Sequence, residues 1–146
     1  MKSAEFWDRW LFFVGWILVL FGLSLGFLNQ TQFFDLAFNH QINSVFWPNG
    51  TPVESIEPFQ AWIYGVLGFT VSGWGVFIVF LARHPFAKRE RWARNCLFVG
   101  FTLWYLTDTA ISLYFGVVFN AVFNTALAAL VFIPLAVTWR EFDSPV

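Results

Sequence analysis

The sequence predicts an all-α integral membrane protein with four transmembrane helices. Three observations predict this class: the hydrophobic content, the length of the uncharged segments and the placement of the basic residues. Hydrophobic residues make up 58% of the chain and charged residues 12%, whereas about a quarter of the residues in a soluble domain are charged. A soluble chain of this size would need more polar residues to cover its surface. We therefore expect lipid to surround much of the chain, and residues 1–146 to form a single domain.

Long uncharged segments locate the spans. Residues 10–34 and 58–82 contain no Asp, Glu, Lys or Arg, and the segment 95–139 contains only one of them. Because a membrane-crossing helix needs about 20 apolar residues, the last segment is long enough for two crossings. We expect a turn at Gly116 to join them and Asn120 to cap the returning helix. The predicted spans are residues 10–28, 59–82, 95–115 and 120–139.

Residues 31–46 are predicted to form a short amphipathic helix in the outer membrane interface. Apolar residues recur there at helical spacing, at Phe34, Phe38, Ile42 and Val45. Polar residues fall mostly on the other face of the helix, as in helices that lie along a membrane surface. A cluster of Pro, Asn and Gly at 48–52 predicts a turn between this helix and the second span.

All eight basic residues fall on one side of the predicted topology. Lys2 and Arg9 precede the first span, Arg140 follows the last one, and the other five lie in the connection 83–94. The positive-inside rule then places this connection and both termini in the cytoplasm, and we expect a bacterial inner membrane. Five residues of the connection are expected to contact lipid headgroups: Arg83, Lys88, Arg89, Arg91 and Arg94.

A stripe of mostly small residues follows the second predicted span at heptad spacing. We name it the small-residue stripe; it consists of Gly65, Gly68, Ser72, Gly75, Val79 and Ala82. Small residues let helix backbones approach closely, which favours helix association in lipid. We expect the stripe to pack against Gly15, Gly22 and Gly26 of the first span. A homodimer contact or a ligand groove is the alternative interpretation.

Asp108 is the charged residue that the sequence places within a span, about 10 Å from its outer end. An ionised Asp at membrane depth costs on the order of 2.5–3.5 kcal/mol on insertion scales, so it should find partners inside the bundle. The side chains expected near it are those of Trp104, Tyr105, Ser112, Asn120, Asn124 and, from the outer loop, His40. These residues either form a structural hydrogen-bonded cluster or line an outward-facing pocket for a cation, an amine or a polar headgroup.

The composition excludes several classes of function. A net charge of −1 and the absence of a basic tail give no basis for nucleic-acid binding. The single cysteine, Cys96, cannot form an intramolecular disulfide or a cysteine-based zinc cluster, and no metal site is expected. The sequence contains no GxSxG, Walker, dinucleotide-binding or HExxH motif. These absences favour a protein that is not an enzyme, and no particular cofactor is indicated.

We expect the protein to bind a small or lipid-like ligand in an aromatic pocket near Asp108. The main alternative is an accessory or assembly subunit of a larger membrane complex, in which exposed Phe side chains form the contact surface. A lower-ranked alternative is a small proton-linked transporter or membrane enzyme that uses Asp108. The expected partners are membrane lipids, a lipophilic ligand, and a membrane-protein partner or further copies of the chain.

Overall fold

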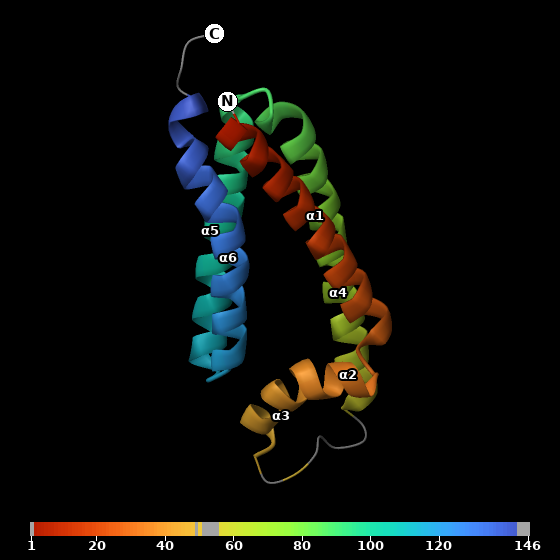
Figure 1. The fold of residues 1–146 in the computed structure, drawn as a ribbon. Helices are drawn as coiled ribbons and strands as arrows, with labels where there is room; N and C mark the ends of the chain where they lie inside the picture. Colours follow the sequence, from red (N-terminus) through yellow and green to blue (C-terminus); the bar gives the residue numbers. More distant parts are fainter. Residues whose placement is uncertain (1, 49, 51–55, 143–146) are drawn as a thin grey trace.

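Four long helices form where the sequence has its uncharged segments (Figure 1). The computed structural model describes residues 2–48, 50 and 56–142, and all regular structure in those residues is helical. The long helices are α1 (Lys2–Leu28), α4 (Glu57–Leu81), α5 (Arg91–Tyr114) and α6 (Val118–Thr138). Each is long and apolar enough to cross a membrane. The prediction of an integral membrane protein with four transmembrane helices is therefore confirmed.

Shorter helical segments connect or extend the long ones. Between α1 and α4 the chain forms α2 (Gln32–Phe34), the π-helical turn η1 (Asp35–Asn39) and α3 (His40–Phe46). The π-helical turn η2 (Ala82–Phe86) extends α4, and the 3₁₀ turn η3 (Trp139–Phe142) extends α6. The predicted helix at 31–46 is thus confirmed as a helical segment. The predicted turn at 48–52 lies largely outside the described residues.

Asn120 is not the N-cap of α6, so this prediction is wrong. The chain reverses through Gly116, whose φ of 75° lies in the left-handed region that glycine adopts at little cost. The turn is shorter than expected, since α6 begins at Val118 with Val117 in the cap position. Asn120 therefore lies in the first turn of the helix. Its side chain is free to contact α5.

The small-residue stripe of α4 packs against α1, as predicted. A Cβ atom added at Gly68 would lie 2.5 Å from the carbonyl oxygen of Gly22, and one added at Gly75 would lie 2.7 Å from that of Gly15. Such distances are too short for a side chain, so the two backbones are in direct contact. Contact is looser at Gly65, where an added Cβ would lie 3.9 Å from the nearest atom.

A buried hydrogen bond reinforces the stripe. Ser72 Oγ donates to the backbone carbonyl oxygen of Val19 at 2.9 Å. A hydroxyl between two lipid-embedded helices stabilises their association because it has no water to bond instead. The intramolecular interpretation of the stripe is confirmed, and α1 and α4 form one tightly packed pair.

The helices form two pairs that meet at one end and diverge towards the other. Figure 1 shows α1 with α4 on one side and α5 with α6 on the other. The pairs meet where α1 begins and where η2 and η3 lie; we name this the closed end. At the opposite end, the open end, α2 and α3 lie across the gap between the pairs.

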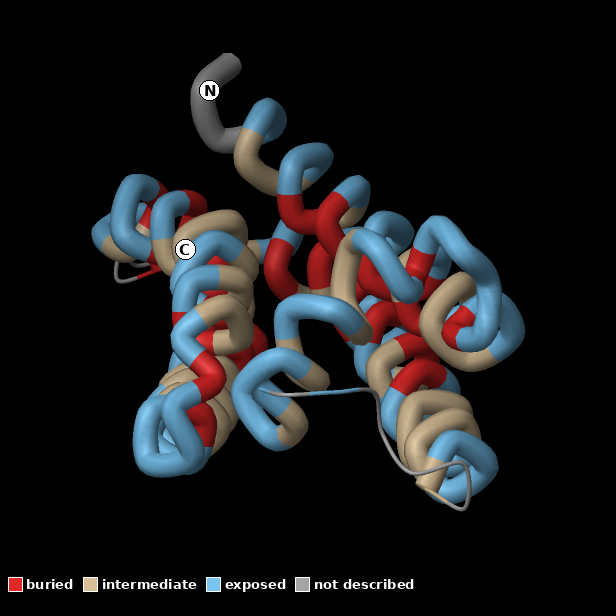
Figure 2. The backbone as a smooth tube through the Cα atoms, turned by 90° about the horizontal axis from the view of Figure 1, so that it is seen from below, coloured by how far each residue is buried: buried red, intermediate tan, exposed pale blue. Residues whose placement is uncertain are grey.

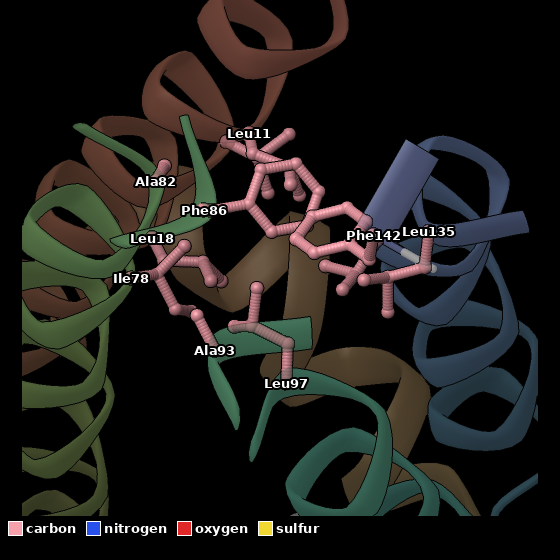
Figure 3. Close-up of a cluster of buried hydrophobic side chains, with 11 residues drawn as sticks. Leu11, Leu18, Ile78, Ala82, Phe86, Ala93, Leu97, Leu135 and Phe142 are labelled. Carbon is pink, nitrogen blue, oxygen red and sulfur yellow. The ribbon is translucent and has the colours of Figure 1, made fainter. Parts of the chain in front are cut away.

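The hydrophobic core lies at the closed end. Figure 3 shows its side chains converging from all four long helices and from η2 and η3. The rings of Phe86 and Phe142 lie 4.8 Å apart at its centre, and Phe86 and Leu11 are completely buried. Trp10 Nε1 adds a hydrogen bond of 2.9 Å to the carbonyl oxygen of Leu130, which joins α1 to α6. Large apolar residues such as Phe13 and Phe80 are exposed, as expected for helices surrounded by lipid. Figure 2 shows that exposed positions occur along all the helices.

The first testable prediction concerns Gly68. A Gly68→Leu substitution should separate α1 from α4 and lower the free energy of unfolding by about 1–3 kcal/mol, because the added side chain has no space. The matched control is Gly73→Leu in the same helix, where an added Cβ meets no atom within 4 Å. Thermal unfolding of the two variants in detergent measures the difference. Equal melting temperatures would show that the helices do not pack through Gly68.

Candidate functional site

An apolar cavity lies between the two helix pairs. Its volume is about 680 Å³, within the usual range for small-molecule sites of about 300–1,000 Å³. All four long helices and the η1–α3 segment contribute to its walls. The aromatic residues in the lining are Phe21, Phe38, Phe46, Tyr64, Trp74, Phe77, Phe101, Trp104, Phe115 and Phe123. We name it the apolar cavity.

Aromatic rings close the cavity between α1 and α6. The ring of Phe21 on α1 lies 5.3 Å from that of Phe123 on α6. Phe38 of η1 lies 5.7 Å from Phe21 and 5.6 Å from Phe123, so three elements meet in one aromatic contact. Phe38 and, further along, Ile42 of α3 line the cavity towards the open end. The amphipathic segment therefore covers the open end with its apolar face.

The side of the cavity between α4 and α5 is the more open one. Several lining residues there keep large exposed fractions, including Leu67 (51%) and Trp74 (47%) on α4 and Ile111 (53%) on α5. These two helices diverge from the closed end onwards (Figure 1). The cavity lining is thus accessible laterally, between α4 and α5, while η1 and α3 lie across the open end.

Asp108 lies in the wall of this cavity and accepts two hydrogen bonds from α6. Its Oδ1 atom accepts from Asn120 Nδ2 and from Asn124 Nδ2, both at 2.9 Å. Ser112 Oγ donates to the backbone carbonyl oxygen of Asp108 at 2.7 Å and accepts from Asn120 Nδ2 at 2.8 Å. Asp108, Ser112, Asn120 and Asn124 form what we name the polar cluster. All four also line the apolar cavity.

The second carboxylate oxygen of Asp108, Oδ2, accepts no hydrogen bond from the residues that the structure describes. Oδ2 is not fully enclosed either. Among the described residues, the enclosed polar side-chain atoms that lack a partner are Asn39 Oδ1 and Thr109 Oγ1. Oδ2 is therefore partly accessible, and the residue that carries it lines the apolar cavity.

The structure brings Trp104 to the cavity, but not Tyr105 or His40. Trp104 lines the wall one turn from Asp108. The hydroxyl of Tyr105 lies 3.3 Å from Thr125 Oγ1, and Tyr105 is not in the lining. His40 is exposed on the polar face of α3, where it lines a separate polar cavity of about 660 Å³ next to the start of α4.

Sequence reasoning missed Gly100, although a signal was present. Gly100, Trp104, Asp108 and Ser112 recur at intervals of four, and one helix face therefore carries all of them. An added Cβ at Gly100 would meet no atom within 4 Å. Gly100 thus keeps the middle of the cavity wide. The contributions of α1 and α4 could not be found from local spacing, because they depend on how the pairs diverge.

Arg89 links the connection 83–94 to residues near both ends of the chain. Its guanidinium group contacts the Asp8 carboxylate at 2.7 and 3.2 Å, and its Nε donates to Glu141 at 2.9 Å. Its Nη1 also donates to the carbonyl oxygen of Phe86 at 2.9 Å. Arg89 has a φ of 59°, a conformation that side-chain-bearing residues rarely adopt and that these contacts hold in place. Arg89 therefore joins the connection to both described ends of the chain.

Two further basic residues of the connection also contact the protein. Arg94 is buried, and its guanidinium carbon lies 4.1 Å from the ring centroid of Trp139. Arg91 donates from Nε to the carbonyl oxygen of Phe142 at 2.9 Å. Arg83, Lys88 and Arg91 are exposed, and the guanidinium carbon of Arg83 lies 5.7 Å from the ring centroid of Phe12. Of the five residues expected to contact headgroups, these three are therefore accessible.

Comparisons with protein families, with curated proteins and with solved structures gave no match. Among the described residues, no group of three or more His, Cys, Asp and Glu side chains is arranged to hold a metal ion. The chemistry of the site therefore follows from the apolar cavity and the polar cluster.

The second prediction tests the polar cluster. Asp108→Leu should lower the free energy of unfolding by about 1–3 kcal/mol, because the amide donors of Asn120 and Asn124 lose their acceptor in an apolar setting. Asp108→Asn keeps an acceptor oxygen and should unfold close to the wild type. Thr107→Leu is the control, since Thr107 is exposed and its hydroxyl bonds only to its own helix. A wild-type melting temperature for Asp108→Leu would contradict the cluster.

Proposed function

We propose that this protein binds a small, lipid-like ligand in the apolar cavity and holds the polar end of that ligand at the polar cluster. The observation that carries the proposal is the combination of a large apolar cavity with a single group of converging polar side chains. Ligand sites in proteins have this composition: apolar walls supply affinity, and a few polar groups fix the orientation. Asp108 offers an unused oxygen at that point.

The cavity suits a ligand with a polar end and an extended apolar part. Between two of its lining residues on α5, Leu97 and Asp108, the helix rises by roughly 16 Å. The wall along this length is apolar, formed by residues such as Phe101 and Leu127. A polar end bound at Asp108 would therefore direct the apolar part towards the closed end.

The lateral opening supports entry from the bilayer. Leu67, Trp74 and Ile111 combine large exposed fractions with positions in the cavity wall, so lipid tails can reach the lining between α4 and α5. A ligand taking this route keeps its apolar part out of water at every step, which avoids the cost of hydrating that surface.

The proposed location is a bacterial inner membrane, with the closed end in the cytoplasm. The basic residues of the connection and Arg140 all lie at the closed end, as the positive-inside rule requires. Exposed Arg83 and Lys88 are placed to contact anionic headgroups on that side. Asp108 then lies in the outer half of the membrane.

The third prediction tests the cavity itself. Gly100→Leu should place a side chain in the cavity without a clash, fold normally and bind less of any co-purifying lipid-like molecule. The matched control is Gly73→Leu, which also meets open space but does not line the cavity. Native mass spectrometry of the purified proteins measures the retained ligand. Equal retention by both variants would contradict binding in the cavity, and a stoichiometric partner chain in place of a ligand would favour an accessory subunit.

The fourth prediction tests the orientation. With Cys96 replaced by Ala, a cysteine introduced at exposed Gln41 of α3 should react with an impermeant thiol reagent added outside the cell. A cysteine at exposed Ala87, near the closed end, should react only after the membrane is permeabilised. The reverse pattern would overturn the proposed orientation.

A further inference from the structure

We infer that the polar end of the ligand is a protonated amine, so that the polar cluster and the apolar cavity together form a site for a lipophilic cation. This inference rests on the proposed function and adds the chemical class of the ligand. It is carried by the direction of the hydrogen bonds in the polar cluster, by the absence of a nearby counter-charge and by the position of Trp104.

The hydrogen bonds within the polar cluster direct donors of Ser112, Asn120 and Asn124 to Asp108, and one Asp108 oxygen receives none from the described residues. Both N–H groups of the Asn120 amide are taken, one by Asp108 Oδ1 and one by Ser112 Oγ. Asn124 donates to the same Oδ1 atom, and the Ser112 hydroxyl donates to a backbone carbonyl. Asp108 Oδ2 remains partly accessible, and Asp108 lines the cavity. Because a carboxylate accepts hydrogen bonds and donates none, it selects a ligand group that donates.

None of the described residues in the cavity wall is a basic residue that could balance the Asp108 carboxylate. The lining contains no Lys, Arg or His, and the described Arg and Lys residues of the connection lie at the closed end. An ammonium group would supply the missing positive charge, and a charge-assisted hydrogen bond is roughly twice as strong as a neutral one. A phosphate group would find no cation in this wall, so the site disfavours phospholipid headgroups.

Trp104 adds an aromatic surface one helical turn from Asp108 in the same wall. Indole is the aromatic group that attracts cations best, and the attraction grows when water is excluded. A neutral hydroxyl would gain neither this attraction nor the charge-assisted bond. The site therefore prefers an amine over an alcohol with the same apolar part.

The test compares three amphiphiles with identical tails: dodecylamine, dodecanol and dodecanoate. The protein is placed in nanodiscs made with phosphatidylcholine, a lipid that has no primary amine, and binding is measured from the shift in melting temperature as each compound is titrated. We expect the amine to bind about tenfold more tightly than the alcohol and the carboxylate to bind least. Asp108→Asn should abolish the preference for the amine while still binding the alcohol.

Two control variants distinguish a failure of this inference from a failure of the proposed function. Asp35→Asn removes an exposed acidic residue outside the apolar cavity and should keep the preference for the amine, whereas Gly100→Leu should weaken binding of all three compounds. If the alcohol binds as tightly as the amine, or if Asp108→Asn keeps the preference, the inference is overturned and the proposed function stands. If no compound binds, or if Gly100→Leu changes nothing, both the inference and the proposed function fall.

Discussion

The backbone contact between α1 and α4 is the constraint on which the rest of the structure depends. Lipid removes the hydrophobic force between transmembrane helices, so close packing and interhelical hydrogen bonds must hold them together. At Gly22 and Gly68 the two backbones touch, and Ser72 adds a bond to Val19. The α1–α4 pair is therefore packed through its own backbones, while α4 and α5 diverge.

Divergence leaves a cavity because the buried hydrophobic core joins the pairs at the closed end only. The core around Phe86 and Phe142 and the ion pairs of Arg89 fix the closed end, where the connection and both described chain ends meet. Further along, α4 and α5 separate, and the aromatic contact through Phe38 closes the opposite side. The polar cluster lies in the space that results. Its position thus follows from the arrangement in which the two helix pairs pack together at the closed end and separate beyond it.

Local patterns in the sequence predicted the elements and several of their contacts, whereas contacts between distant segments could not be predicted. Uncharged length located the four helices, and helical spacing placed Ser112, Asn120 and Asn124 near Asp108. The role of Arg89 was missed because its partners, Asp8 and Glu141, lie near opposite ends of the chain. Hydropathy also gives no information on the angle between helix pairs, so the contributions of α1 and α4 to the cavity could not be predicted.

The most direct test of this account is a pair of distances between spin labels on α4 and α5, measured by double electron–electron resonance in nanodiscs. One pair replaces exposed Trp62 and Leu113 near the open end, and the other replaces exposed Phe80 and Trp92 near the closed end, both in a protein without Cys96. Helix pairs that diverge predict a clearly longer mean distance for the Trp62–Leu113 pair. Equal distances at the two ends would mean that the helices run parallel, and the cavity on which the proposed function rests would not exist.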